Sequence, residues 1–327
     1  MKTRTFGRLG WAISEVGYGT WGLAGGEGGW TGASPVQAMR CLEHAVEHGC
    51  NFFDTAWVYG RGEGERQLGQ LLAHHHGEKL YVATKVPPKN RVWPSRRGDR
   101  YTDIFPEDHV RDYVRRSLDG LKVDRIDLLQ FHVWEDAWCN ADEWLTTVSD
   151  LKREGLVEGI GISINRWEPT NVLATLRTGL VDAVQVIYNI FDQAPADELL
   201  PECRRLDVAV VARVPYDEGS LCGGLTRESR WPEGDWRNSY FVPENLLPTL
   251  KRVEALRAGL AHDEPLASVA LRFVLSHPGI AVVVPGMRSI PHIDANMACS
   301  VPGPLPGDTL SMLARHRWDR QPTWWSQ

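Results

Sequence analysis

The feature that most constrains the fold is the regular alternation of short apolar runs with segments of helical periodicity. Eight such runs recur along the chain, and helical segments separate them. Chains that alternate strands with helices form parallel sheets, and eight units of this kind close into a (β/α)8 barrel, the TIM-barrel fold. We therefore expect an α/β barrel whose strands lie at 16–18, 51–54, 80–85, 126–132, 159–163, 183–186, 208–213 and 280–284.

The length and the uniform composition predict one domain over residues 1–327. A barrel of this type typically takes roughly 250 residues, so the chain has room for insertions. Residues 2–13 alternate weakly, which predicts a short N-terminal hairpin. Residues 87–105 and 214–243 are too long for simple connections, and we expect them to be active-site loops at the C-terminal rim. The tail at 300–327 is rich in proline and tryptophan and has no clear period.

The composition disfavours several classes of partner. A net charge of −6 without a basic run offers no field that would attract nucleic acid or an anionic membrane, so the expected partner is a small molecule. No apolar run reaches the roughly 18 residues that span a bilayer, and the first residues lack the apolar core of a signal peptide. Six cysteines are scattered without a C-x-x-C pair, which favours reduced thiols over disulfides or a metal site. We expect a cytoplasmic protein without a metal centre.

The segment from Gly17 to Gly22 matches G-x-G-x-x-G, the dinucleotide fingerprint of Rossmann folds. A true fingerprint opens directly into a helix and meets an acidic residue about 20 positions later. Here a glycine-rich loop continues to Gly32. We therefore interpret the match as accidental, and a Rossmann dehydrogenase is the less favoured alternative.

Polar side chains close six of the expected strands. Singly, each of them could be a salt bridge or a packed residue at the rim. In a closed parallel barrel, however, all carboxyl ends of strands converge on one rim, where this architecture places its chemistry. The sequence therefore predicts one site that contains Asp54, Lys85, His132, Ser163, Gln185 and Arg213.

Four residues of this region suggest acid–base chemistry: Asp54, Tyr59, Lys85 and His132. A phenol with a pKa of about 10 is a poor acid at neutral pH, but a nearby ammonium can lower that pKa by roughly 1–3 units. We expect Lys85 to do this for Tyr59, while Asp54 holds Lys85 in place. His132 would orient a substrate carbonyl. Tyr59 could then give a proton to a carbonyl oxygen that receives hydride, and a cofactor must supply the hydride because no side chain can.

Several segments resemble the aldo-keto reductases over residues 2–299, in the same order. The similarity lies in Asp54-Thr55-Ala56-x-x-Tyr59-Gly60, the pair Thr84-Lys85, His132, the segment 161–165, Gln185 and the segment 284–288. The resemblance implies a (β/α)8 barrel that binds NADP(H), less often NAD(H), and interconverts carbonyls, including aldehydes, ketones and sugar lactols, with alcohols. It implies a catalytic tetrad of Asp54, Tyr59, Lys85 and His132, with Tyr59 as proton donor. It also assigns the nicotinamide carboxamide to Ser163 and Gln185.

The sequence departs from the family pattern at two cofactor positions. The family usually has Ser-Asn after the fifth strand, whereas here Ile164 separates Ser163 from Asn165, which is the candidate substitute. Many members place an aromatic ring on the nicotinamide at the end of strand seven. This chain has Arg213 there, and a planar guanidinium can also stack.

The adenosine end of the cofactor is expected after the last strand. Arg288 leaves that strand just before a helix, where it could meet a 2′-phosphate, so we favour NADP(H) with NAD(H) as the other candidate. The resemblance assigns the adenine contact to Asn296. A regulatory role of the kind found in the potassium-channel β subunits is the alternative function, and the complete tetrad argues against it.

Fourteen tryptophans are unusual for this length, and several lie in loops rich in glycine and proline. Most can be explained by packing under long loops, but some could line an aromatic substrate cleft. The residues expected to line the cleft are Trp21, Trp57 and Trp134.

Overall fold

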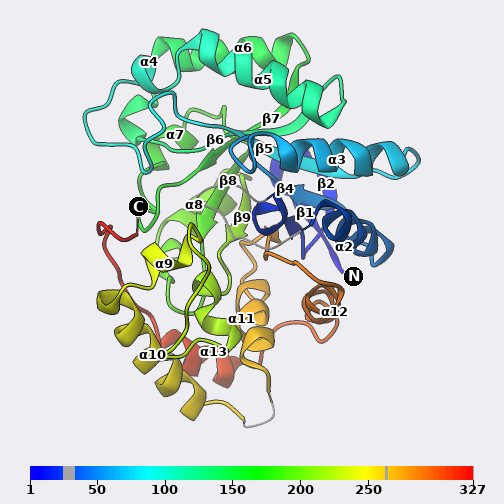
Figure 1. The fold of residues 1–327 in the computed structure, drawn as a ribbon. Coiled ribbons are helices and arrows are strands. Elements are labelled where there is room, and N and C mark those ends of the chain that lie inside the picture. Colours follow the sequence, from blue (N-terminus) through cyan, green and yellow to red (C-terminus); the bar gives the residue numbers. More distant parts are fainter. Residues whose placement is uncertain (25–33, 262–263, 327) are drawn as a thin grey trace.

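The computed structural model describes residues 1–24, 34–261 and 264–326, and its centre is a parallel sheet of eight strands (Figure 1). Neighbours in the sheet are also neighbours in the chain. Parallel bridges from Val16 to Val283 and from Gly19 to Gly286 join the two outer strands, so the sheet closes and the expected barrel is confirmed. The strands are β3 (Tyr18–Gly19), β4 (Phe52–Asp54), β5 (Tyr81–Val86), β6 (Ile126–Phe131), β7 (Val157–Ser163), β8 (Ala183–Ile187), β9 (Ala209–Arg213) and β10 (Val282–Val283).

The glycine-rich segment has a structural role at this seam. A side chain at Gly17 would come within 2.9 Å of the Phe52 carbonyl oxygen, and one at Gly19 within 2.9 Å of the Val284 carbonyl oxygen. Glycine is therefore required for the strands to approach at the point of closure. Within the described residues, β3 is followed by α1 (Trp21–Ala24). The closed eight-stranded sheet and the place of these glycines at its seam contradict the Rossmann alternative.

Helices cover the outside of the barrel and bury one face each. In α2 (Pro35–Glu47) the hydroxyl of Ser34 accepts a hydrogen bond from the N–H of Gln37, which caps the helix. The buried face of α2 consists of Ala38, Cys41, Leu42, Ala45 and Val46. The longer helices are α2 (Pro35–Glu47), α3 (Glu63–His74), α5 (Glu107–Leu121), α6 (Asp142–Arg153), α10 (Pro243–Ala258), α11 (Leu266–Leu275) and α12 (Ile290–Ala298), and α8 (Leu199–Arg205) is shorter.

The N-terminal hairpin is confirmed and closes the floor of the barrel. It pairs β1 (Thr3–Phe6) with β2 (Trp11–Ser14), antiparallel, around a 3-10 turn, η1 (Gly7–Leu9). Phe6, Trp11 and Ile13 are buried in one cluster with the inward-facing side chains of the barrel strands. The apolar interior is therefore sealed at the end opposite the expected site.

Tertiary structure adds elements that the periodicity did not predict. The tail contains α13 (Gly307–Ala314), although its sequence has no clear period. The long loops contain α4 (Tyr101–Ile104), α9 (Arg237–Tyr240) and the 3-10 segment η4 (Asp217–Cys222). Between β7 and β8 the structure has only the short helix α7 (Leu173–Leu176). Further 3-10 turns are η2 (Asp136–Trp138) and η3 (Ala194–Ala196). Among the described residues, no helix has both the length and the apolar character needed to cross a membrane.

Candidate active site

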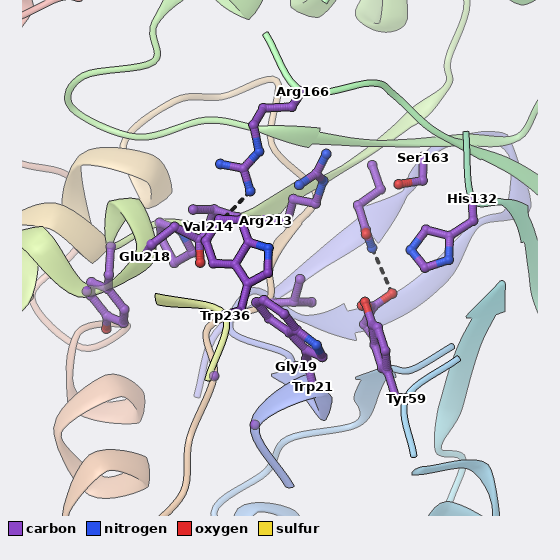
Figure 2. A pocket seen from close by; sticks show the side chains of 18 of the residues that line it. Gly19, Trp21, Tyr59, His132, Ser163, Arg166, Arg213, Val214, Glu218 and Trp236 are labelled. Carbon is purple, nitrogen blue, oxygen red and sulfur yellow. Dashed lines mark hydrogen bonds and ion pairs between the residues drawn. The ribbon is translucent and has the colours of Figure 1, made fainter. Parts of the chain in front are cut away.

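A cavity of about 1000 Å³ opens at the carboxyl ends of the barrel strands. Figure 2 shows polar side chains that reach into it from several separate strand ends. The sequence predicted this convergence, because parallel strands in a closed barrel all end on one rim. The predicted residues that line the cavity are Trp21, Asp54, Tyr59, His132, Ser163, Asn165, Gln185, Arg213, Arg288 and Asn296.

A buried ion pair lies at the base of the cavity. The Lys85 ammonium is 1% exposed and donates to both carboxylate oxygens of Asp54, each at 2.8 Å, and to the carbonyl oxygen of Thr55 at 2.7 Å. All three of its N–H bonds are therefore engaged. The pair comes from adjacent parallel strands, β4 and β5. Burial lowers the pKa of Lys85, and the Asp54 carboxylate opposes that shift.

Two glutamine side chains also orient Asp54. The amide of Gln185 donates to Asp54 Oδ1 at 2.7 Å, and the amide of Gln130 donates to the same oxygen at 3.2 Å. Gln130 is fully buried on β6, beside Lys85 in the strand register. Gln130 could not be identified from the sequence, because a polar residue in mid-strand has no distinguishing pattern.

Tyr59 lies above this pair in the loop after β4. Its ring centroid is 5.2 Å from Lys85 Nζ and 6.1 Å from the His132 ring centroid. Burial raises the pKa of the Tyr59 phenol and the Asp54 carboxylate raises it further, whereas Arg213 acts in the opposite direction. The net direction is upward, because burial outweighs the neighbouring Arg213 cation. Lys85 has bound its N–H groups to Asp54 and Thr55, so the expected lowering by its charge stays a prediction. The phenol stays protonated at neutral pH.

His132 follows β6 and faces Tyr59 across the cavity (Figure 2). Burial lowers its pKa well below the usual value, and Lys85 and Arg213 lower it further. The imidazole is therefore neutral and has one N–H to donate. Its Nδ1 is buried and has no hydrogen-bond partner among the described residues.

The three residues expected at the nicotinamide have different surroundings. Ser163 is buried at the end of β7 and lines the cavity. Arg213 ends β9, and its terminal nitrogen donates to the carbonyl oxygen of Ile164 at 3.0 Å. Burial, and to a lesser extent the neighbouring Arg166, lower the pKa of Arg213 to about 10. Gln185 lines the cavity, but its amide nitrogen is bound to Asp54.

Asn165 is tied into a separate network of loop residues. Its amide nitrogen donates to Ser95 Oγ and to the Trp134 carbonyl oxygen, both at 2.9 Å, and its side-chain oxygen accepts from the Trp134 N–H. This network joins the loop at 87–105 to the loops after β6 and β7. To bind the nicotinamide carboxamide, Asn165 would first have to leave these partners.

Arg288 and Asn296 lie at another part of the cavity wall. Arg288 is half-buried; burial lowers the pKa of its guanidinium, and the neighbouring Arg237 lowers it further. Asp235, which pairs with Arg237 at 2.8 Å, acts on the Arg288 pKa in the opposite direction. On α12, Asn296 accepts a hydrogen bond from the Tyr216 hydroxyl.

Two of the three tryptophans expected in the cleft do not line it. Trp134 is fully buried, and its indole N–H donates to Thr175 Oγ1 at 2.8 Å. Trp57 packs edge-on against Tyr113 of α5, with ring centroids 4.9 Å apart. The prediction was wrong for Trp57 and Trp134 for the same reason: a loop side chain next to a catalytic position can point outward into the shell of helices. The tryptophans that do line the cavity are Trp21, Trp93 and Trp236.

The cavity wall also contains an ion pair that the sequence did not predict. Arg166 donates to Glu218 at 2.8 Å, and its guanidinium lies 5.2 Å from the Trp236 ring centroid (Figure 2). Glu218 has a positive φ of 56°, which is unusual for a residue other than glycine. Its position after strand nine was the only available signal. Ser326 of the tail lines the same cavity.

The cavity suits a nicotinamide dinucleotide and a small substrate. Its volume is at the upper end of the roughly 300–1000 Å³ of ligand pockets. Buried polar atoms without a partner among the described residues, His132 Nδ1 and Arg213 Nε, lie in residues of its wall. Arg288 supplies a cation for a phosphate. When bound, the nicotinamide supplies the hydride that no side chain can provide.

Comparisons with known proteins agree with this architecture. A NADH-specific methylglyoxal reductase of Escherichia coli is 29% identical over 314 residues, which cover 91% of this chain and 93% of that protein. A D-threo-aldose 1-dehydrogenase of a Pseudomonas species is 29% identical over 299 residues, covering 85% and 87%. The solved structure of aldo-keto reductase AKR11C1 from Bacillus halodurans, in its holo form, matches with a TM-score of 0.76 and 25% identity over the whole of both chains.

The profile of the Aldo/keto reductase family matches residues 15–317, which include all eight barrel strands and every predicted site residue. The chain therefore belongs to the aldo/keto reductase family.

Proposed function

We propose that this protein is an NADP(H)-dependent oxidoreductase that interconverts a carbonyl and an alcohol, with Tyr59 as the proton donor. The carbonyl is that of an aldehyde, a ketone or a sugar lactol. The observation that carries the proposal is the cavity in which a protonated phenol and a neutral imidazole face each other above a buried Lys85–Asp54 pair.

In the proposed reaction the carbonyl oxygen lies between Tyr59 and His132. The neutral imidazole donates a hydrogen bond that orients this oxygen, and the phenol gives it a proton as hydride reaches the carbon. Asp54 and Lys85 hold the base of the site rigid, since each is bound to the other through two hydrogen bonds. Water is restricted by the aromatic walls formed by Trp21, Trp93 and Trp236.

The preference for NADP(H) rests on Arg288, whose guanidinium lies in the cavity wall. A guanidinium there could bind a 2′-phosphate through charge-assisted hydrogen bonds. The relative from Escherichia coli is named as NADH-specific, so both cofactors belong in every assay.

The test is a panel of aldehydes, ketones, sugars and alcohols, followed at the nicotinamide absorbance with NADP(H) and NAD(H). We expect turnover of at least one carbonyl, with higher kcat/KM for NADPH. Tyr59→Phe keeps the packing of the ring and deletes the hydroxyl, so reduction should fall by roughly 10²–10⁴-fold while cofactor binding persists. If the Tyr59→Phe protein retains most of its reductase rate, another group must donate the proton, and His132 is the next candidate.

The regulatory alternative gives a different result in the same assay. A nicotinamide-binding regulatory subunit would bind cofactor and turn over no carbonyl of the panel. The relatives reported above are named as reductases and a dehydrogenase, and those names do not support that alternative.

A further inference from the structure

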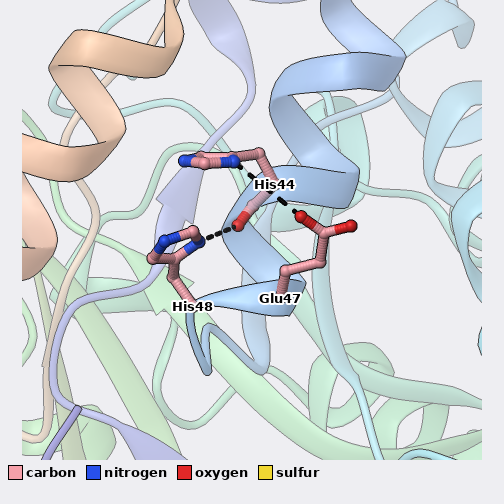
Figure 3. Close-up of side chains that lie close together, drawn as sticks. All are labelled: His44, Glu47 and His48. Carbon is pink, nitrogen blue, oxygen red and sulfur yellow. Dashed lines mark hydrogen bonds and ion pairs between the residues drawn. The ribbon is translucent and has the colours of Figure 1, made fainter.

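A cluster of imidazole and carboxylate groups lies outside the active site, on the last turn of α2 and its C-cap residue, His48. His44, Glu47 and His48 are spaced i, i+3 and i+4, which places them on one face of the helix. Figure 3 shows the three side chains gathered at this end of α2. The sequence predicted no metal centre, because its cysteines form no C-x-x-C pair and its catalytic residues have no metal-ligand spacing.

The three side chains offer ligand atoms at short mutual distances. One nitrogen of each imidazole and one carboxylate oxygen lie within 4.8 Å of one another. In particular, His44 Nδ1 is 3.8 Å from a carboxylate oxygen of Glu47. A metal ion bound at about 2.0–2.2 Å needs ligands roughly 3.4 Å apart, so small side-chain rotations close the site. Glu47 is 67% exposed and free to make them.

A fourth side chain already holds His44 in a suitable orientation. The Nε2 of His44 is 2.7 Å from a carboxylate oxygen of Asp294, on α12. Asp294 can only accept at this contact, so Nε2 carries the proton and, in the neutral ring, Nδ1 presents its lone pair toward Glu47. A carboxylate behind a histidine is the usual support for a metal-ligating imidazole.

In a neighbouring histidine cluster, by contrast, carboxylates already bind both ring nitrogens of His75. In it, His75 donates through Nδ1 to Glu78 at 2.8 Å and through Nε2 to Glu43 at 2.7 Å. These contacts raise the pKa of His75, because both carboxylates favour the imidazolium. An imidazolium with both nitrogens bound has no lone pair for a metal, and His74 is also bound to Glu43 through Nδ1.

We propose that His44, Glu47 and His48 form a binding site for a divalent transition-metal ion, with Asp294 as the residue that orients His44. Imidazole nitrogen with a carboxylate oxygen suits ions such as zinc, copper(II) and nickel(II). Water completes the coordination, since the site is on the surface. The ion would also connect α2 to α12, the helix that carries Asn296.

The experiment is a zinc titration of the tag-free, chelator-treated protein in competition with a chromophoric chelator. Cobalt(II) absorption reports the coordination independently. The wild type should bind zinc at this site, while His48→Ala and Glu47→Gln should weaken binding by at least tenfold. Asp294→Asn should weaken it by about 10–100-fold, the range found for residues that support a metal ligand. The matched control is His74→Ala, which removes an exposed histidine of the neighbouring cluster and should leave the affinity unchanged.

Two results would overturn the proposal. The first is a wild-type protein that binds no zinc, or cobalt without the absorption of a nitrogen-ligated site. The second is binding that survives in His48→Ala and Glu47→Gln, or that His74→Ala abolishes, since the ion would then be at residues 74–78. Circular dichroism of each variant shows that a loss of affinity is not a loss of fold.

Discussion

At the scale of single residues, the site is set by which hydrogen bonds each polar group has already made. Lys85 has given its three N–H groups to Asp54 and Thr55, so it acts on Tyr59 through space and not through a hydrogen bond. Burial then decides the ionisation of Tyr59 and His132, and it keeps both neutral. A neutral phenol and a neutral imidazole are the forms that can donate to a carbonyl oxygen.

The first prediction at this scale concerns pH. Reduction requires the phenol, which is present below the pKa of Tyr59 and is lost as pH rises through it. Because burial raises this pKa above its usual value of about 10, kcat/KM for reduction should stay level through neutral pH and decline only in strongly alkaline solution. Oxidation of the alcohol should increase over the same alkaline range. A decline in reduction centred near neutral pH would mean that cofactor or substrate lowers the pKa of Tyr59, as the sequence analysis expected of Lys85.

The second prediction concerns cofactor choice. If Arg288 binds the 2′-phosphate, Arg288→Ala removes a charge-assisted hydrogen bond and should weaken NADPH by roughly 1.5–3 kcal/mol. NADH has no 2′-phosphate, so its dissociation constant serves as the internal control and should hardly change. Fluorescence titration measures the dissociation constants of both cofactors. An equal loss of affinity for NADPH and NADH would mean that Arg288 does not bind the 2′-phosphate.

At the scale of elements, the cavity wall is made from segments that the chain brings back from far apart. The tail after α13 packs against the loop at 214–243, and Ser326 reaches the cavity. Arg320 connects the two: it is 7% exposed and donates to Asp192, to Asp217 at 2.8 Å and to the hydroxyl of Tyr240 at 3.0 Å. One guanidinium therefore neutralises part of the charge of two buried carboxylates.

Loss of this guanidinium should be costly. Arg320→Ala leaves Asp192 and Asp217 buried without their cation, and the free energy of unfolding should fall by roughly 3–5 kcal/mol. The matched control is Arg317→Ala, which breaks surface pairs with Asp197 and Asp319 and should cost about 0–1 kcal/mol for each pair. Urea denaturation of the two variants gives both values, and similar losses would show that burial of the Arg320 cluster has no special importance.

At the scale of the whole molecule, the two ends of the barrel have separate tasks. The hairpin seals the floor with Phe6, whose ring centroid is 5.1 Å from that of Trp11 and 5.4 Å from that of Phe52. The chemistry lies at the other end, at the carboxyl ends of the strands. Stability and catalysis should therefore respond to different substitutions.

Phe6→Ala tests this separation. It opens a cavity in a fully buried aromatic cluster, so the free energy of unfolding should decrease by roughly 3–5 kcal/mol. The kcat and cofactor affinity of the protein that remains folded should be unchanged. Tyr59→Phe is the converse control, with lost activity and nearly unchanged stability. Denaturation and steady-state kinetics on both proteins are the measurements, and a large drop in kcat for Phe6→Ala would contradict the separation.

The sequence alone determined the barrel, its hairpin and the rim on which the polar residues meet. The physical reason is local: alternating apolar patterns define strands and helices, and a polar residue at the end of each strand must lie at one edge of a parallel barrel. Asp54, His132 and Arg213 could be placed in this way without coordinates. The cap at Ser34 is equally local, because its hydrogen bond spans three residues.

Only the tertiary structure decided how these groups are paired and which side chains reach the cavity. Gly17 and Gly19 serve the barrel seam because β10, far away in the chain, passes within contact distance of them. Trp134 turns into the shell of helices, while Trp236 reaches the cavity from a distant loop. The pKa of Tyr59 depends on burial by segments that only folding assembles. Periodicity determines which face of an element is apolar, but the direction of a loop side chain and the ionisation of a buried group depend on contacts between residues far apart in the sequence.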